Sequence, residues 1–184
     1  MNDKELIIKD QVEVRDCPLH GYITIQDNNG KYLVKKHNMI VNSGRQYLLN
    51  KAFGVSAVAN TNINSIYFGI NGDLTTPDMA FNSSNVVISA NIAYTSSSIF
   101  ASTFTIPEII SSNSTNTAYY NINTDNNCMI IKTKIPNEAV NTGQTIKEIG
   151  LVLSDNNLFS RVVHEPITIG PQMSSYTVTY YVYF

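Results

Sequence analysis

Histidine and glutamate are the side chains of this chain best suited to acid–base or metal chemistry. His20, His37 and His164 are scattered, and none lies two or four residues from another histidine or from a cysteine. Zinc sites with a readable sequence signature use short Cys and His spacings. We therefore expect surface or hydrogen-bonded histidines and no metal or cofactor, with a zinc site built from distant residues as the alternative.

Catalytic motifs are also missing. The Gly-x-Ser-x-Gly pattern of a nucleophile elbow does not occur, and residues 69–72 lack the Gly-Lys-Ser/Thr end of a phosphate loop. His164 and Glu165 precede Pro166, which favours extended backbone before it. We interpret this pair as a corner at a strand end, and we predict a protein with no catalytic residues that is not an enzyme.

The two cysteines, Cys17 and Cys128, are far apart in the sequence. A disulfide between them is one possibility, but isolated cysteines in a reducing compartment are more often free thiols. Cys17 also has His20 three residues on. A reactive thiol there is the less favoured alternative.

The tripeptide Asp-Asn-Asn occurs three times, at 27–29, 125–127 and 155–157. Its oxygens suit calcium. Asp and Asn also tolerate left-handed backbone and cap their own turns. Because each copy has one carboxylate and none has the spacing of a calcium loop, we favour the turn interpretation.

The composition argues against two classes of partner. Hydrophobic residues make up 43% of the chain and charged residues only 14%, with a net charge of −2. Without a basic run, a surface that follows nucleic-acid phosphates is not expected. No apolar run reaches the roughly 18 residues of a membrane span. The first five residues lack the layout of a signal peptide, so we expect synthesis in a cytoplasm.

The elements that must position these side chains are mostly strands. Residues 176–184 alternate, with Tyr176, Val178, Tyr180, Val182 and Phe184 forming one apolar face. Ile149, Leu151 and Leu153 share a face of another strand in the same way. These patterns favour a sheet organised around the last forty residues.

A hairpin and a helix occupy the N-terminal third. Residues 21–35 form two strand patterns around Asn29-Gly30, a pair that supplies the positive φ angles of a tight turn. The sequence predicts a helix over 44–53, with Ser43 as N-cap and Gly54 at its left-handed end. Its narrow apolar stripe pairs Leu48 with Ala52 and Leu49 with Phe53.

The remaining patterns are strands separated by polar loops. Strands are predicted near 65–70, 86–94, 98–106, 119–122 and 129–135, and 159–163. Many short strands without intervening helices favour an all-β fold. We predict an antiparallel β-sandwich, jelly-roll-like or immunoglobulin-like, with one short helix. It would form a single domain over 17–184, preceded by an N-terminal arm or edge strand over 1–16.

The C-terminal third resembles virion structural proteins of tailed bacteriophages. The resemblance rests on residues 146–151 (Ile-Lys-Glu-Ile-Gly-Leu), 158–161 (Leu-Phe-Ser-Arg), Pro166-Ile167 and the closing strand 177–184. It extends weakly to 36–45 and 67–72, and covers about a third of the chain. It implies a small structural protein of the tail, neck or capsid surface that acts by assembly and is located in the virion.

Assembly implies other virion proteins and copies of the chain itself as partners. The predicted interface combines Leu6, Ile7, Ile8, Val12 and Val14 of the arm with Tyr181 and Tyr183. These two tyrosines lie opposite the apolar face of the last strand, where a second sheet of the same chain or a neighbouring subunit would cover them. The alternative function is a carbohydrate-binding module for host attachment, which the eleven tyrosines favour and the absence of Trp disfavours.

Overall fold

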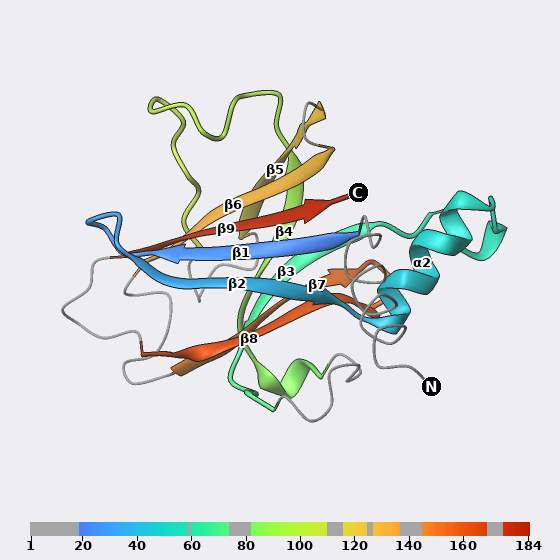
Figure 1. The fold of residues 1–184 in the computed structure, drawn as a ribbon, viewed down its shortest axis with the longest axis horizontal. Helices are drawn as coiled ribbons and strands as arrows, with labels where there is room; N and C mark the ends of the chain where they lie inside the picture. The colour runs from blue at the N-terminus through green and yellow to red at the C-terminus, as the bar shows by residue number, and fades with distance from the viewer. Residues whose placement is uncertain are drawn as a thin grey trace, which may run out of the picture.

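Nine strands close into a barrel, and one α-helix lies across one of its ends (Figure 1). The computed structural model describes residues 19–58, 60–73, 82–109, 116–124, 127–136, 145–168 and 175–184. In chain order the elements are β1 (His20–Gln26), β2 (Tyr32–Ile40), α2 (Asn42–Ala52), the 3₁₀ turn η1 (Ser56–Val58), β3 (Ile63–Gly69), the 3₁₀ turn η2 (Ser83–Asn85), β4 (Val86–Tyr94), β5 (Thr117–Asn123), β6 (Cys128–Pro136), β7 (Thr145–Leu153), β8 (Leu158–Thr168) and β9 (Ser175–Tyr183).

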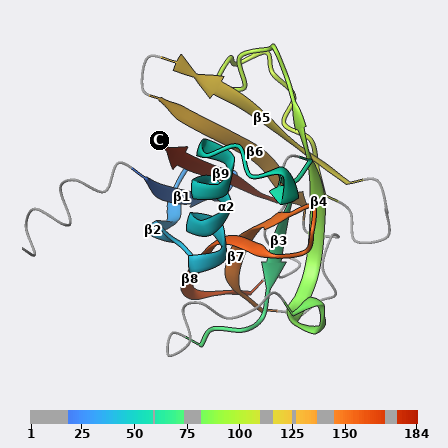
Figure 2. The same ribbon diagram turned by 90° about the vertical axis from the view of Figure 1, so that its right-hand side faces the viewer.

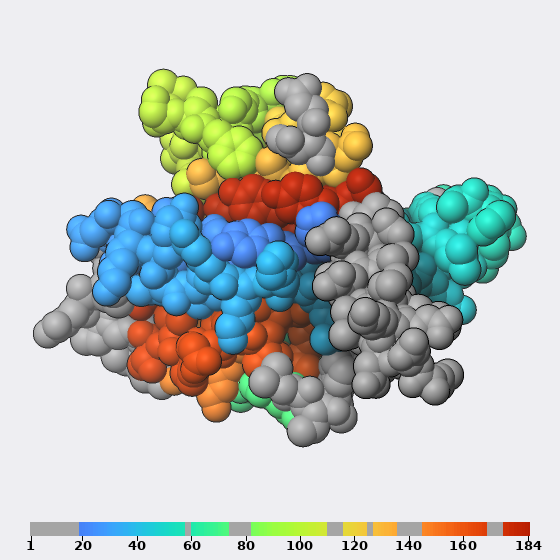
Figure 3. Space-filling model, in the orientation of Figure 1, coloured from blue at the N-terminus to red at the C-terminus, as the bar shows by residue number. Residues whose placement is uncertain are grey.

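The last strand closes the barrel. The strand order is β1-β2-β8-β7-β3-β4-β5-β6-β9, and β9 returns to pair with β1. It is antiparallel to β1 from His20↔Tyr183 to Gln26↔Thr177 and antiparallel to β6 from Cys128↔Tyr183 to Pro136↔Ser175. In Figure 3 the C-terminal residues (red) form a band between the N-terminal strands (blue) below and the yellow and green segments of the chain above. Both edges of β9 are therefore paired, as a closed sheet requires.

The predicted β-sandwich is wrong, although the expectation of a strand-rich chain with one helix is confirmed. Alternation predicts which face of a strand is buried, but it is the same in a sandwich and in a barrel. The sheet also departs from purely antiparallel pairing, because β5 runs parallel to β4. Residues 98–106, predicted as a strand, form turns and irregular backbone. In this segment Ile99 is buried against the outer face of β6, beside Cys128 and Ile130.

The barrel interior is filled by the alternating side chains of its wall. The predicted inward row of β9 is confirmed for Tyr176, Val178, Tyr180 and Val182, all at most 2% exposed. Ile149, Leu151 and Leu153 of β7 belong to the same core. Phe184, predicted to complete the row, lies beyond the last strand pair and is half exposed.

A small polar network lies inside this core. The hydroxyl of Tyr180 is 2.8 Å from Ser160 Oγ and accepts a hydrogen bond from Asn38 Nδ2 at 2.8 Å. Burial raises the pKa of Tyr180 to about 12. The neutral phenol therefore links β2, β8 and β9 across the barrel.

Helix α2 is held by close backbone contact. The amide nitrogen of Val41 donates to the carbonyl of Phe159, and Gly44 packs on that same residue. The predicted N-cap is wrong: Val41 occupies the cap position without a side-chain hydrogen bond, and the Ser43 hydroxyl donates to the carbonyl of Leu158. Gly54 has a φ of +66°, as predicted for the residue that ends the helix.

We predict that Gly44→Ala destabilises the protein even though it improves helix propensity. A Cβ at this position would overlap the carbonyl oxygen of Phe159. Overpacking costs about 1–3 kcal/mol, more than the roughly 1 kcal/mol gained by replacing a helical glycine. Urea denaturation should show a lower midpoint for Gly44→Ala than for the wild type. The control Gln46→Ala, at an exposed position two residues further along α2, should change the midpoint little. Equal midpoints for all three proteins would contradict the packing described for α2.

Candidate functional site

The histidines do not converge on one site. His20 stacks on Tyr183 with ring centroids 4.7 Å apart, and His37 contacts the edge of Tyr22 on the outside of the barrel. His164 lies in the wall of β8 and is 4% exposed. Among the described residues no group of three or more His, Cys, Asp or Glu side chains could hold a metal ion.

His164 is a buried, neutral imidazole. Its Nδ1 lies 2.7 Å from the carbonyl oxygen of Glu165, so Nδ1 carries the proton and Nε2 is the acceptor. Nε2 has no hydrogen-bond partner among the described residues. Burial lowers the pKa of His164, with Lys36 adding to the effect and Glu165 opposing it. The Glu165 side chain is exposed, with an oxygen 3.9 Å from Lys36 Nζ. Because β8 continues through both residues to Thr168, the predicted corner at a strand end is wrong.

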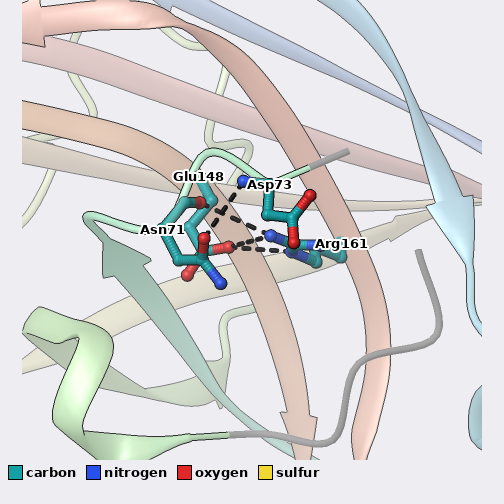
Figure 4. A network of polar contacts seen from close by, with 4 residues as sticks. All are labelled: Asn71, Asp73, Glu148 and Arg161. Atoms are coloured by element: carbon teal, nitrogen blue, oxygen red, sulfur yellow. Dashed lines mark hydrogen bonds and ion pairs between the residues drawn. The ribbon is translucent and has the colours of Figure 1, made fainter. Parts of the chain in front are cut away.

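An ion pair on the outer side of the wall is the most buried charged cluster that the structure describes (Figure 4). Nε and Nη2 of Arg161 each lie 2.7 Å from Glu148 Oε2, and both side chains are at most 4% exposed. Arg161 Nη2 also donates to the carbonyl of Asn71 at 3.4 Å. The Asn71 side chain in turn accepts from the amide of Asp73 at 3.0 Å.

This cluster connects the residues just after β3 with strands β7 and β8. Burial raises the pKa of Glu148, and the hydrogen bond from Arg161 opposes that effect. The two opposite charges are paired with each other and buried away from water. We therefore assign the pair a structural role. The sequence reasoning missed it; the signal was a Glu and an Arg within two otherwise apolar strand patterns.

Two of the three Asp-Asn-Asn copies have the predicted turn role. Asp27 Oδ1 accepts from the amides of Asn29 and Lys31, both at 2.9 Å. Asp155 Oδ1 accepts from the amide of Asn157 at 3.0 Å, next to Asn156 with a φ of +65°. The third copy includes residues 125–126, which lie outside the described residues.

Cys128 is a buried free thiol whose pKa is raised by burial. Cys17 lies outside the described residues. The thiol of Cys128 faces the covering segment around Ile99 rather than a nucleophile-activating base.

The predicted interface residues fall in two places. Leu6, Ile7, Ile8, Val12 and Val14 lie outside the described residues. Tyr181 and Tyr183 are half-buried on the outer face of β9, as alternation predicts. Part of their cover comes from this chain: Ile99 and Phe104 belong to the same cluster. The cover is thus a loop segment of the same chain and not a second sheet, and an interface role for the two tyrosines stays a prediction.

One end of the barrel is open and apolar. We call this opening the mouth; its cavity has a volume of about 590 Å³. Its lining comes from the inner ends of β3 to β6, from α2 and from the C-terminus: Tyr47, Asn62, Ile63, Ile92, Tyr94, Tyr120, Ile122, Asn127, Cys128, Met129 and Phe184. Figure 2 looks onto this end, with α2 lying across one side of it.

The mouth exists because α2 covers only part of the barrel end. Tyr47 packs edge-on against Phe159 at 6.1 Å and donates its hydroxyl to the carbonyl of Thr61 at 3.1 Å. These contacts hold α2 over β8 and over the residues that precede β3. Among the described elements no helix covers the side formed by β4, β5 and β6, and Tyr94 and Ile122 are more than half exposed although both belong to inward rows.

Exposed hydrophobic residues concentrate at the same end. The structure describes ten exposed large hydrophobics, and six of them belong to α2, the residues after it, or the mouth: Leu49, Phe53, Val55, Tyr94, Ile122 and Phe184. Phe53 is 79% exposed. The predicted stripe of α2 is therefore only partly correct, because Leu48 packs on the core whereas Leu49 and Phe53 face solvent. Concentrated exposed apolar surface marks binding sites.

Comparisons of the chain with protein-family models, with curated protein sequences and with solved structures give no match. Within the described ranges no helix has the length and apolar character that a membrane span requires. The exposed hydrophobic residues at one end of the barrel and the mouth are therefore the features that point to a function.

We predict that Arg161→Met alone destabilises the protein by about 3–5 kcal/mol, because it leaves the buried carboxylate of Glu148 without its partner. The double variant Glu148→Leu/Arg161→Met removes both charges and should recover most of that loss. Chemical denaturation of the wild type, both single variants and the double variant measures this. A double variant as unstable as Arg161→Met would contradict the assignment.

We predict that His164 makes the fold acid-sensitive. Its folded pKa is lower than the unfolded value of about 6.5, so on acidification the unfolded state binds the proton first. The stability that the neutral imidazole contributes is fully present well above pH 6.5 and is lost as pH falls from there towards the folded pKa.

The measurement is the free energy of unfolding at pH 7.5 and at pH 5.5. His164→Leu should lose this part of the pH dependence, whereas His37→Gln, at an exposed position, should keep it. The same pH dependence in wild type and His164→Leu would contradict the prediction.

Proposed function

We propose that this protein is a non-catalytic structural component of a bacteriophage virion that acts by assembling with copies of itself and with other virion proteins. The observation that carries the proposal is the apolar end of the barrel, where six of the ten exposed large hydrophobics gather. Burying such a surface is favourable by about 25 cal/mol per Å². A surface of this kind is suited to a protein partner.

Two further observations support assembly. Each strand from β1 to β9 has a paired neighbour on both sides, although β2 pairs with β8 only at Met39 and Ile40, so most of the wall offers no edge for strand addition. The described polar clusters are used internally, as in the pair of Glu148 and Arg161. The resemblance of residues 146–184 to phage virion proteins is the reason for proposing that the protein assembles in a virion.

The alternative, carbohydrate binding, needs aromatic rings with a free face. The ring of Tyr183 stacks on His20 with planes 9° apart, and Lys35 Nζ lies 3.5 Å from the centre of the Tyr32 ring. These faces are occupied by protein groups. We therefore keep glycan binding as an outcome of the test rather than as a second proposal.

We predict that Leu49→Ser/Phe53→Ser weakens assembly without unfolding the barrel, because both side chains face solvent on α2. The measurements are the mass in solution by light scattering and the amount of protein in purified phage particles by mass spectrometry. Ile70→Ser, which removes an exposed hydrophobic residue elsewhere, is the matched control.

The wild type and Ile70→Ser should associate and enter particles, and the double variant should do so less. Absence of the wild-type protein from particles would overturn the proposal. Binding on a glycan array by a protein that is absent from particles would favour the alternative.

A further inference from the structure

We propose that the mouth of the barrel is the receptor for the N-terminal apolar run Leu6-Ile7-Ile8 of a second copy of this chain. The inference deepens the proposed function, on which it rests, by naming the contact through which two copies associate. It depends on the chemistry of the mouth, on the sequence of the arm and on where the arm joins the barrel.

The mouth suits aliphatic side chains. Its lining includes Ile63, Ile92, Ile122 and Met129, and its volume is about 590 Å³. A dry cavity of about 150 Å³ lined by aliphatic side chains already binds benzene. The mouth therefore has room for several branched side chains. Polar side chains also line it, among them Asn62 and Asn127, and the Tyr47 hydroxyl is already engaged with the carbonyl of Thr61.

The arm carries a matching segment. Leu6, Ile7 and Ile8 are three consecutive aliphatic residues, preceded by Asp3-Lys4-Glu5 and followed by Lys9-Asp10. Charged residues on both sides limit how much of the arm can enter an apolar cavity, because an unpaired buried charge is costly. The segment thus matches a plug whose two ends stay in water.

The arm joins the barrel at the rim of the mouth. His20, the first residue of β1, pairs with Tyr183 of β9 and stacks on its ring. Phe184, which follows Tyr183, lines the mouth. Phe184 is held there by donating its amide to the carbonyl of Asn127 at 3.0 Å. Ten residues lie between Ile8 and Leu19, so the two are eleven residue steps apart and about 35 Å apart when the segment is extended.

A second copy accounts for more of this surface than the chain's own arm does. The point where the arm joins the barrel and the receptor lie at the same end, so two copies facing one another with these ends can exchange arms reciprocally and form a closed, two-fold contact. The same approach covers Leu49 of α2 and Phe53 and Val55 just after it, which three inserted side chains of the chain's own arm would leave exposed.

Cross-linking between differently tagged full-length chains tests the proposal. One chain carries Ile7→Cys and the other Ile122→Cys, both in a Cys17→Ser/Cys128→Ala background, because the free thiol of Cys128 also lines the mouth. Mild oxidation with diamide should give a disulfide-linked heterodimer on a non-reducing gel. The matched control replaces Ile122→Cys by Tyr32→Cys, an exposed aromatic position at the start of β2, at the far end of the barrel. Docking should raise the yield at least about tenfold over the control through effective concentration.

Three results would overturn the proposal. The first is a heterodimer yield no higher than with Tyr32→Cys. The second is a cross-link confined to single chains when Ile7→Cys and Ile122→Cys are in one protein, which would assign the mouth to the chain's own arm. The third is an apolar small molecule retained by the wild type in native mass spectrometry without an arm cross-link.

The failure of this proposal is distinguishable from the failure of the proposed function. If the cross-link is absent but Leu49→Ser/Phe53→Ser still lowers incorporation into particles, the assembly function stands and only the receptor role of the mouth falls. If the wild-type protein is absent from particles, the function itself falls.

Discussion

The pairing of β9 with both β1 and β6 is the constraint on which the structure depends. It joins the last strand to the first and removes the two edges that an open sheet would expose. Closure also gives each strand one inward and one outward face. Tyr176, Val178, Tyr180 and Val182 fill the interior, while Tyr181 and Tyr183 face outward, where a covering segment of the same chain and His20 contact them.

Closure of the wall leaves the two ends of the barrel to be covered by other elements. Helix α2 has 11 residues, which corresponds to about 16 Å of helix, too short to cover the end of a nine-stranded barrel. It is fixed over β8 by Gly44 and Tyr47, on one side of the opening. The inward rows of β4 and β5 therefore end in solvent, at Tyr94 and Ile122. The mouth is thus a consequence of a wide barrel with a short helical cover.

Local features of the fold could be predicted from the sequence, and the closure could not. The alternation of residues 176–182 gives the buried face of β9, and Asn29-Gly30 gives the turn of the first hairpin, where Gly30 has a φ of +77°. Which strands pair is a long-range property that alternation does not encode. Residues 98–106 show the same limit, because Ile99 is buried on the outside of the wall and resembles a strand residue in the sequence.

The candidate site lay beyond the reach of the sequence for the same reason. Ile92, Ile122 and Met129 look like ordinary strand residues, and only the barrel brings their strand ends to one opening. Ser43 and Leu49 were misassigned because α2 is oriented by backbone contact with Phe159 rather than by its own cap and stripe. The signal that the sequence did hold was Phe184, an aromatic residue extending an inward row beyond the last strand.

A density map of the assembled protein, obtained by electron cryo-microscopy of the full-length chain in its associated form, tests the central claim most directly. The account predicts side-chain density for Leu6, Ile7 and Ile8 inside the mouth, continuous with the arm of the facing copy, and α2 buried at the contact. A map in which copies meet through the outer wall of the barrel, with the mouth open to solvent, would contradict it.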